Sequence, residues 1–450
     1  MSAEPPVIVP TTPETELDLP ASIPVTPGWL ERERLLRWGK ILGSFFSAQG
    51  LAQLLSMTAG FVLMRMMAVE QYALYTLAFS FITFFNFATD LGSTASLVHF
   101  YRRSQAEGES FAPYAAAVLS LRRLVFLFGT LAVLASFPLI ASGRGGSPVG
   151  ATLAALGVVV TVGFQLTASV QLLELRLADR YGPSYRAEIA GAALRLALAL
   201  LLAALAFLPA WAAVASGALA MGLVALLSRP AEKRPVVAEA LAPFRRRVLR
   251  YLLPTLPSAL YFSVQAPLVV WLAATFGETR NIAEVGAVGR LGLLVGLLSS
   301  LVGTVFLPHL ARIADERAYR RRFFQFGALL AGLAALLWLF ALLVPQLFLW
   351  LLGANYSGLR TELLLVLGAA GLALLDGYVV GVNFARSWTR WQSVMLLVQI
   401  AAQAVMVALL PLSSTRGVLQ LNLWTAAVAL LLQSLTVAAG FLRPKWVTWS

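Results

Sequence analysis

Long uncharged apolar stretches recur along the whole chain, separated by short polar segments. An α-helix needs about 20 predominantly apolar residues to cross the hydrocarbon core of a bilayer. By that measure the pattern predicts twelve spans, at 41–64, 72–98, 115–141, 149–173, 185–207, 209–228, 248–275, 284–308, 323–351, 361–385, 390–411 and 417–442. The sequence therefore predicts an all-α polytopic membrane protein.

Composition agrees with this prediction. Hydrophobic residues make up 59% of the 450 residues, charged residues make up 12%, and the mean hydropathy is +0.79. Soluble domains have about 45–50% apolar and about 25% charged residues. A surplus of apolar surface this large requires a solvent as apolar as a bilayer.

The positive charge is distributed as in membrane proteins that follow the positive-inside rule. The net charge is +13, but it lies in short clusters between spans and not on one basic domain, which excludes nucleic acid as a partner. Of the 34 Lys and Arg residues, 27 fall on the side of the chain termini, 6 fall on the other side and Arg195 lies within a span. We therefore expect a multi-pass protein of the cytoplasmic membrane with both termini in the cytoplasm.

The two halves of the chain resemble each other. Each contains six predicted spans, and the only two histidines, His99 and His309, both follow the second span of their half with an arginine three residues later. Six is an even number, so both halves enter the membrane from the same side. This predicts two lobes related by a pseudo-two-fold axis along the membrane normal, with the substrate path between them.

The predicted organisation has five parts. The first 27 residues contain seven prolines and four acidic residues and no apolar core, a composition typical of disorder. The parts are a disordered cytoplasmic tail with a basic end at 1–39, a lobe at 40–228, a basic linker at 229–247, a lobe at 248–442 and a tail at 443–450.

Several function classes are excluded by what the sequence lacks. There is no cysteine, only two histidines are present, and no Gly-rich loop ends in Gly-Lys-Ser/Thr, so we expect no metal, no cofactor and no direct use of ATP. All predicted loops are short, which leaves no room for a catalytic domain. We therefore expect a transporter and no enzymatic activity.

Two segments carry a family resemblance. Residues 65–75 and 88–92 contain Arg65, the turn Glu70-Gln-Tyr72 and Asp90-Leu-Gly92, while 285–291 and 306–308 read Val-Gly-Ala-Val-Gly-Arg-Leu and Phe-Leu-Pro. The chain resembles the multidrug/oligosaccharidyl-lipid/polysaccharide exporter superfamily over residues 40–442, in particular its polysaccharide branch of Wzx-type flippases. It departs from that branch at Gln265-Ala266, where a charged pair is common.

The resemblance implies a flippase that moves an undecaprenyl-pyrophosphate-linked oligosaccharide across the cytoplasmic membrane by alternating access. Such a protein serves lipopolysaccharide or exopolysaccharide synthesis. Its expected partners are the lipid-linked oligosaccharide, membrane lipids, H⁺ or Na⁺ as coupling ion, and other membrane proteins of polysaccharide assembly. One alternative is a cation-coupled drug or small-solute exporter of the same superfamily, and another is a membrane-embedded glycan polymerase or ligase.

Charged residues within spans are costly and are therefore candidates for function. Arg195 lies near the middle of its span, and a guanidinium suits phosphate oxygens, so we expect it to bind the pyrophosphate of the substrate. The alternative is an ion pair with Glu188 or Asp90 that holds helices together. Arg290 is the expected counterpart in the second half, with an interfacial topology charge as its alternative.

The remaining candidates are intramembrane acids, polar stripes and prolines. Asp90, Asp376 and Glu188 are candidates for ion coupling; the alternative for the two aspartates is a locally partnered carboxylate. Polar residues on one face of spans 1, 2 and 7, which line the central cleft in the resembled family, add five substrate-binding candidates: Gln49, Gln53, Thr83, Tyr261 and Gln265. Pro254 and Pro257 are expected to bend span 7 and to serve in gating.

Overall fold

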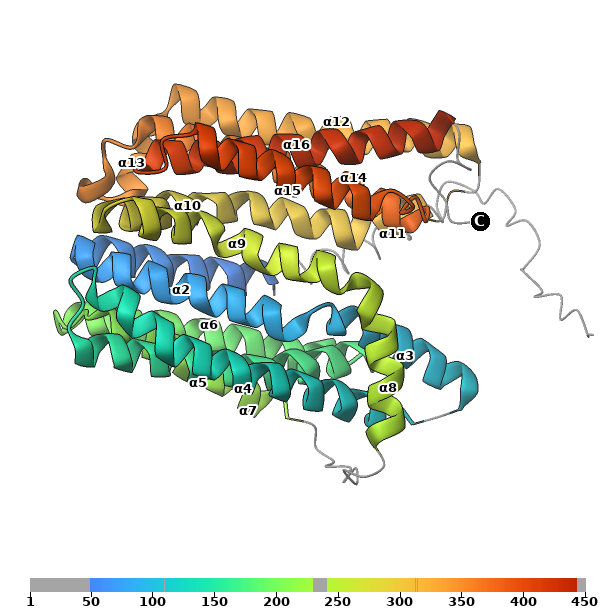
Figure 1. Ribbon diagram of the computed structural model, residues 1–450, viewed down its shortest axis with the longest axis horizontal. Helices are drawn as coiled ribbons and strands as arrows, with labels where there is room; N and C mark the ends of the chain where they lie inside the picture. The colour runs from blue at the N-terminus through green and yellow to red at the C-terminus, as the bar shows by residue number, and fades with distance from the viewer. Residues whose placement is uncertain (1–48, 109, 230–240, 312, 314, 443–450) are drawn as a thin grey trace, which may run out of the picture. The chain divides into compact units, whose positions relative to one another are not determined.

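The computed structural model describes residues 49–442, apart from residues 109, 230–240, 312 and 314. A first helix occupies residues 49–66. The other helices of the N-terminal half are α2 (Val69–Asp90), α3 (Ser93–Glu107), α4 (Ala112–Ser142), α5 (Pro148–Leu177), α6 (Tyr181–Ala204) and α7 (Ala210–Leu227) (Figure 1). The predicted tails at 1–39 and 443–450 and most of the predicted linker lie outside the described residues.

The C-terminal half is also helical throughout the part that the structure describes. Its elements are α8 (Ala242–Leu252), η2 (Leu253–Thr255), α9 (Leu256–Phe276), α10 (Thr279–Leu301), η3 (Val302–Phe306), α11 (Leu307–Ala311), α12 (Glu316–Leu343), α13 (Pro345–Leu352), η4 (Ala354–Tyr356), α14 (Arg360–Ala385), α15 (Gln392–Leu409) and α16 (Thr415–Leu442).

The predicted fold class is confirmed. Among the described residues, nine helices are long and apolar enough to cross a membrane, and a tenth span results if the two segments of the bent α9 are counted together. The helix at 49–66 and α10 occupy the two remaining predicted spans.

The second span of each half is interrupted, which the sequence analysis did not predict. Helix α2 ends at Asp90 because Leu91 and Gly92 adopt left-handed backbone angles, with φ of 42° and 78°, and α3 begins as a separate helix. In the second half, α10 ends at Leu301 and gives way to the π-helix η3. The two interruptions precede His99 and His309, so they occupy corresponding places in the two halves.

Helix starts are fixed by local capping chemistry. Ser147 caps α5 by accepting a hydrogen bond from the backbone N–H of Gly150, with a proline at the first helical position. Asp315 caps α12 in the same way, and Glu278 and Asn281 form a reciprocal capping box at the start of α10. These caps satisfy backbone donors that a helix end leaves without partners.

Helix α2 packs against both halves. Within the first half it contacts α4, α5 and α7, and across to the second half it contacts α9 and α10. The second half is assembled around α14, which packs against α10, α12 and α16. In the most apolar 18-residue stretch of α2, 61% of the residues are buried inside the protein. Helix α15, by contrast, has no buried residue. Helix α2 is therefore the core element that joins the two lobes.

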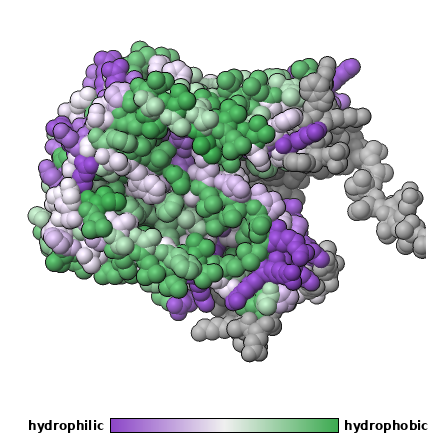
Figure 2. Space-filling view, in the orientation of Figure 1, coloured by the Kyte–Doolittle hydropathy of each residue, from purple (hydrophilic) through white to green (hydrophobic). Residues whose placement is uncertain are grey.

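The surface has the character of a lipid-facing protein. Leu139 on α4 is 75% exposed and Leu409 on α15 is 72% exposed. Figure 2 shows broad apolar surfaces over the helices of both halves, with hydrophilic residues gathered toward the helix ends. Exposed apolar area of this extent is not tolerated in water but is expected in a bilayer.

A buried arginine holds the interruption between α2 and α3 in place. Arg122 of α4 is 4% exposed, forms an ion pair with Asp90 and donates to the hydroxyl oxygens of Ser93 and Ser169, each at 2.7 Å, and of Thr94 at 2.9 Å. The Asp90 carboxylate also accepts from the Thr94 hydroxyl at 2.5 Å. By sequence alone, Arg122 is one of the 27 basic residues that the positive-inside rule places on the side of the termini.

We predict that Arg122→Leu lowers the free energy of unfolding by about 3 kcal/mol, because removing one partner leaves the charge of Asp90 uncompensated. The measurement is thermal or denaturant unfolding of the purified protein. The control is Arg123→Leu, the same change at the adjacent exposed residue. Equal stability of the two variants would show that the Arg122 network does not hold α2 and α3.

Candidate functional site

A cavity of about 450 Å³ lies between the two halves. One wall is α2, and the others are α9, α10, α14 and α16 of the second half. The cavity has a polar lining within otherwise apolar walls, made by Thr76, Ser80, Thr83, Gln265, Arg290 and Asn422. Hydroxyl, amide and guanidinium groups therefore face one space between the lobes.

Arg290 is the charged group of this cavity. Its side chain is buried, its Nε donates to the hydroxyl oxygen of Tyr72 at 3.4 Å, and its Cζ lies over the rings of Tyr75 at 5.6 Å and Phe79 at 5.4 Å. In the described part of the chain, no carboxylate lies within ion-pair distance of Arg290. Gly60 makes room for it, because a Cβ there would lie 2.5 Å from Nη1.

Arg195 of α6 approaches the same tyrosine from the first half. Its Nη2 donates to the Tyr75 hydroxyl at 2.9 Å, and its Nε is buried without a hydrogen-bond partner among the described residues. Neither of the two ion pairs considered as alternatives is formed, because Glu188 accepts from Arg176 at 2.8 Å and Asp90 pairs with Arg122. Arg195 is not part of the wall of the 450 Å³ cavity.

Two guanidinium groups from different halves thus converge on Tyr75. The tyrosine is 2% exposed and lies beside Tyr72, with ring centroids 6.0 Å apart. Phenol hydroxyls and ring faces stabilise the cations without neutralising them. In surroundings of low dielectric constant, two uncompensated positive charges attract an anion strongly. A guanidinium also matches the geometry of phosphate oxygens.

The structure places only some of the predicted polar residues at the cavity. Thr83 and Gln265 line it. Tyr261 donates to Gln403 at 3.2 Å, and Gln403 donates to Gln265 at 3.0 Å. These two hydrogen bonds connect α9 with α15. The predicted candidates Gln49 and Gln53 lie half-buried on the first helix and are not part of the cavity wall.

The three acidic candidates have different surroundings. Asp90 and Glu188 are paired with arginines, whereas the Oδ1 atom of Asp376 on α14 is buried and has no hydrogen-bond partner in the described part of the chain. The described residues contain no group of three or more histidine and acidic side chains that would hold a metal ion.

The bend in span 7 lies at a proline that the sequence analysis did not select. The two segments of α9, Leu256–Gln265 and Pro267–Phe276, meet at 54°. Pro254 lies in the short helix η2 that links α8 to α9, and Pro257 lies in the first turn of α9. The bend is therefore at Pro267, where the ring removes a backbone donor inside the helix.

Sequence reasoning also missed Tyr75 and Asn422 as parts of the site. Tyr75 lies three residues after Tyr72 on the same face of α2, so the spacing was informative, but an aromatic pair at helical spacing is typical of ordinary core packing. Asn422 is a single amide within an apolar helix, and nothing in its neighbourhood along the chain indicates which way it faces.

The halves are held together at one end of the bundle, here called the closed end. Arg144, in the loop between α4 and α5, donates to the carbonyl oxygens of Gly277 at 2.5 Å and of Ala274, and Arg65 lies over the ring of Trp350 at 5.0 Å. At the opposite end, the described residues of α3 and α8 make no extensive contact with α11 or α12. The topology prediction assigns the closed end to the extracytoplasmic side.

Comparison with solved structures finds the same fold in several other proteins. The chain is similar to the lipid II flippase MurJ in an inward closed conformation, with a TM-score of 0.66, 14% identity and coverage of 89% of both chains. It is also similar to an inward-facing multidrug resistance MATE family transporter of the MOP superfamily, with a TM-score of 0.63, 15% identity, and coverage of 86% of this chain and 95% of that one. The fold of this chain is therefore like that of these two proteins.

A eukaryotic MATE transporter matches as well, with a TM-score of 0.57, 12% identity, and coverage of 88% of this chain and 96% of that one. No family model and no curated protein matches the sequence. The matched folds consist of two helical lobes, so the predicted architecture is confirmed. The neighbours named here are exporters and a flippase, and at these identities the likeness concerns the fold alone.

We predict that Tyr75→Phe destabilises the protein by about 1–3 kcal/mol, because it leaves the Arg195 guanidinium half-buried without its hydrogen-bond acceptor. The measurement is the unfolding midpoint of the purified protein. Tyr181→Phe is the control, since Tyr181 begins the helix that carries Arg195 and is 45% exposed. A Tyr75→Phe protein as stable as the control would contradict the role of this hydroxyl.

Proposed function

We propose that the protein is a flippase that translocates a polyprenyl-diphosphate-linked oligosaccharide across the cytoplasmic membrane, for the synthesis of a surface polysaccharide. The observation that carries the proposal is Arg290, a buried cation in the cavity between the lobes without a carboxylate partner in the described part of the chain. Such a charge is costly unless an anionic ligand repays it. A diphosphate is an anion that a guanidinium binds in a bidentate manner.

The rest of the cavity suits the glycan. Threonine and serine hydroxyls and the amides of Gln265 and Asn422 are both donors and acceptors, as sugar hydroxyls require. Arg195 reaches the same tyrosine from the other lobe, so a diphosphate drawn to Arg290 would also experience its charge. We therefore assign the diphosphate to Arg290, with Arg195 acting at longer range, and the sugars to the polar side chains of the cavity.

Alternating access follows from how the lobes are connected. Helix α2 contacts α9 and α10 across the lobes, and α8, the short helix before α9, packs against α4 of the first lobe. The closed end is held by a few hydrogen bonds and ring contacts, which one rocking motion of the lobes would exchange for contacts at the other end. The bend at Pro267 in α9 and the prolines at its start are the places where backbone rotation would be absorbed.

Ion coupling is assigned to Asp376. Its buried Oδ1 has no hydrogen-bond partner among the described residues, so a proton or Na⁺ would relieve the cost of the charge. Asp90 and Glu188 are less suited, because each already neutralises an arginine. The same carboxylate favours the second candidate function, a cation-coupled exporter of small solutes, whose substrate would be found by the efflux of cationic dyes.

The proposed function is tested by deleting the gene and measuring lipid-linked oligosaccharide on each leaflet of the cytoplasmic membrane. We expect the intermediate to accumulate on the cytoplasmic leaflet and the surface glycan to be lost, because the head group would have no path through the bilayer. Complementation with the intact gene is the control. Normal distribution on both leaflets would refute glycan flipping and would favour the exporter.

We predict that Arg290→Gln lowers transport about tenfold or more while the protein remains folded, because a charge-assisted contact to a phosphate contributes about 1.5–3 kcal/mol. The measurement is leaflet-resolved translocation in the deletion strain, normalised to protein in the membrane. Arg195→Glu should also reduce export, because the reversed charge repels the diphosphate.

Two further variants make this test specific. Arg416→Gln removes an exposed arginine and should transport normally. Gly60→Ala keeps the charge but displaces the Arg290 guanidinium, so it should reduce transport. At Gly50 a new Cβ would meet no atom of the described residues within 4 Å, so Gly50→Ala should transport normally. Full export by Arg290→Gln would rule out its assignment to the diphosphate.

A further inference from the structure

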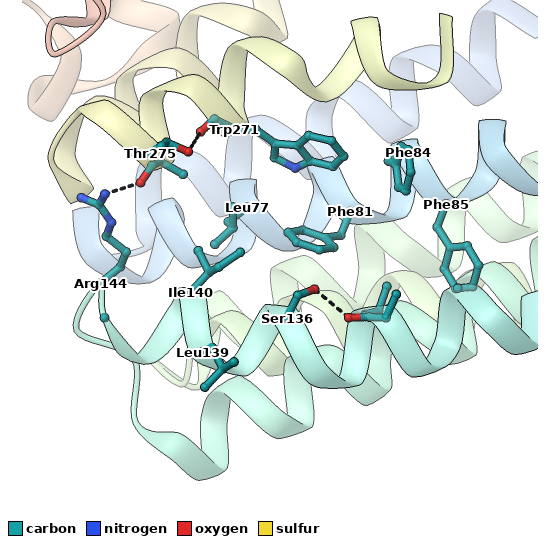
Figure 3. A pocket seen from close by; sticks show the side chains of 15 residues that line it. Leu77, Phe81, Phe84, Phe85, Ser136, Leu139, Ile140, Arg144, Trp271 and Thr275 are labelled. Atoms are coloured by element: carbon teal, nitrogen blue, oxygen red, sulfur yellow. Dashed lines mark hydrogen bonds between the residues drawn. The ribbon is translucent and has the colours of Figure 1, made fainter. Parts of the chain in front are cut away.

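A second hollow, of about 650 Å³, lies on the other side of α2 from the polar cavity. We call it the aromatic groove. Its walls are α2 and α4 of the first lobe and α9 of the second, and the rings of Phe81, Phe84, Phe85 and Trp271 line it (Figure 3). The facing positions on α4 include Ala132 and Gly129, and the Phe85 ring occupies the place that a Cβ of Gly129 would take.

The aromatic groove has a cation at one end and only apolar residues at the other. Figure 3 shows Arg144 at one end of the groove, while Phe84 and Phe85 lie toward the other. Arg144 donates to the carbonyl oxygens of Ala274 and Gly277, which fix its position but do not neutralise its charge. The groove is therefore shaped for an amphiphile with an anionic head at Arg144 and an apolar tail along the rings.

The aromatic groove and the polar cavity share a wall. Trp271, which lines the groove, donates from its indole N–H to the hydroxyl oxygen of Ser80 at 3.1 Å, and Ser80 lines the cavity. The Trp271 ring also lies 5.0 Å from Phe84 and 5.7 Å from Phe81 between ring centroids. One face of the α2–α9 contact is thus polar and the opposite face is aromatic.

We propose that the aromatic groove binds the polyprenyl tail of the transported lipid, with its diphosphate next to Arg144. This inference rests on the proposed function and names a second subsite for the same substrate. Arg144 lies at the closed end, which is assigned to the extracytoplasmic side. The groove would therefore hold the lipid after its head group has crossed the membrane and before it leaves the protein.

Three features favour this occupant over a phospholipid acyl chain. A diphosphate carries more negative charge than a phosphodiester, so Arg144 attracts it more strongly. Isoprenoid chains carry methyl branches along their length, so they offer more side groups than an unbranched acyl chain for contact with the rings that line the groove. Both lobes contribute to the groove, so its width would follow the rocking motion that the transport of the same molecule requires.

Photo-crosslinking in a defined membrane tests the proposal. The full chain with p-benzoylphenylalanine at Ala132, which lines the groove, is placed in nanodiscs of phosphatidylethanolamine and phosphatidylglycerol containing undecaprenyl diphosphate. The matched control carries the label at Ala135, an exposed alanine on the same helix that is not part of the groove wall. Adducts are identified by mass spectrometry after irradiation.

We expect the label at Ala132 to capture undecaprenyl diphosphate in preference to phospholipid, and the label at Ala135 to capture phospholipid. Phospholipid adducts alone at Ala132, or equal polyprenyl capture at both positions, would overturn the proposal. Ala132→Trp fills the groove and should weaken binding of undecaprenyl diphosphate about tenfold relative to Ala135→Trp, which corresponds to ~1.4 kcal/mol. Unchanged binding with Ala132→Trp would also overturn it.

The two proposals fail in different ways. If the deletion strain shows lost translocation while Ala132 captures only phospholipid, the flippase assignment stands and the groove is a lipid-filled surface. If Ala132 captures the polyprenyl chain specifically while both leaflets of the deletion strain are normal, the groove site stands and the glycan flipping is wrong. Ser136, one turn further along the groove wall, provides a second labelling position if the first disturbs folding.

Discussion

The arrangement of the lobes depends on positive charge buried where they meet. Arg290 and Arg195 lie against Tyr75 from opposite halves without a carboxylate partner in the described residues, and burying unpaired guanidinium groups costs several kcal/mol. The structure meets that cost with phenol hydroxyls, ring faces and a cavity lined by polar groups. Fully closed packing between the lobes would remove that cavity, so the same charge that attracts an anion also prevents the seam from becoming an ordinary apolar core.

Helix α2, which lies between the lobes, has a polar face and an aromatic face. The face with Thr76, Ser80 and Thr83 borders the polar cavity, and the face with Phe81, Phe84 and Phe85 borders the aromatic groove. A helical repeat of 3.6 residues separates the two sets of side chains onto different faces. A single helix between the lobes thus presents one surface suited to a hydrated head group and another suited to an apolar chain, and an amphiphilic substrate requires both.

The sequence was sufficient for the fold because the membrane imposes a length and a charge bias that are local properties of the chain. The site was harder to predict because partners lie far apart in sequence. The basic residue count could not distinguish Arg122, which folds into a buried network with Asp90, from its exposed neighbour Arg123. The same difficulty hid the hydroxyl that Arg195 contacts, since Tyr75 is 120 positions away. The interruption after Asp90 depends on the positive φ of Leu91, a non-glycine residue that carries no turn signal.

The closed end also shows why the lobes can separate at small cost. Arg144 binds carbonyl oxygens at the C-terminal end of α9, and the last carbonyls of a helix have no partner within the helix and are accessible to water at a membrane surface. Opening would therefore replace these protein–protein hydrogen bonds by hydrogen bonds to water. The net free energy of such an exchange is about 0.5–1.5 kcal/mol for a neutral bond and about 1.5–3 kcal/mol for a bond with a charged partner, such as those of Arg144. Arg290, by contrast, lies within the bundle and would keep its place on α10 as the lobes rock. In the proposed mechanism, rocking changes the contacts of Arg290 with Tyr72, Tyr75 and Phe79 of the first lobe, while the cation itself stays on α10 and remains available to an anionic head group.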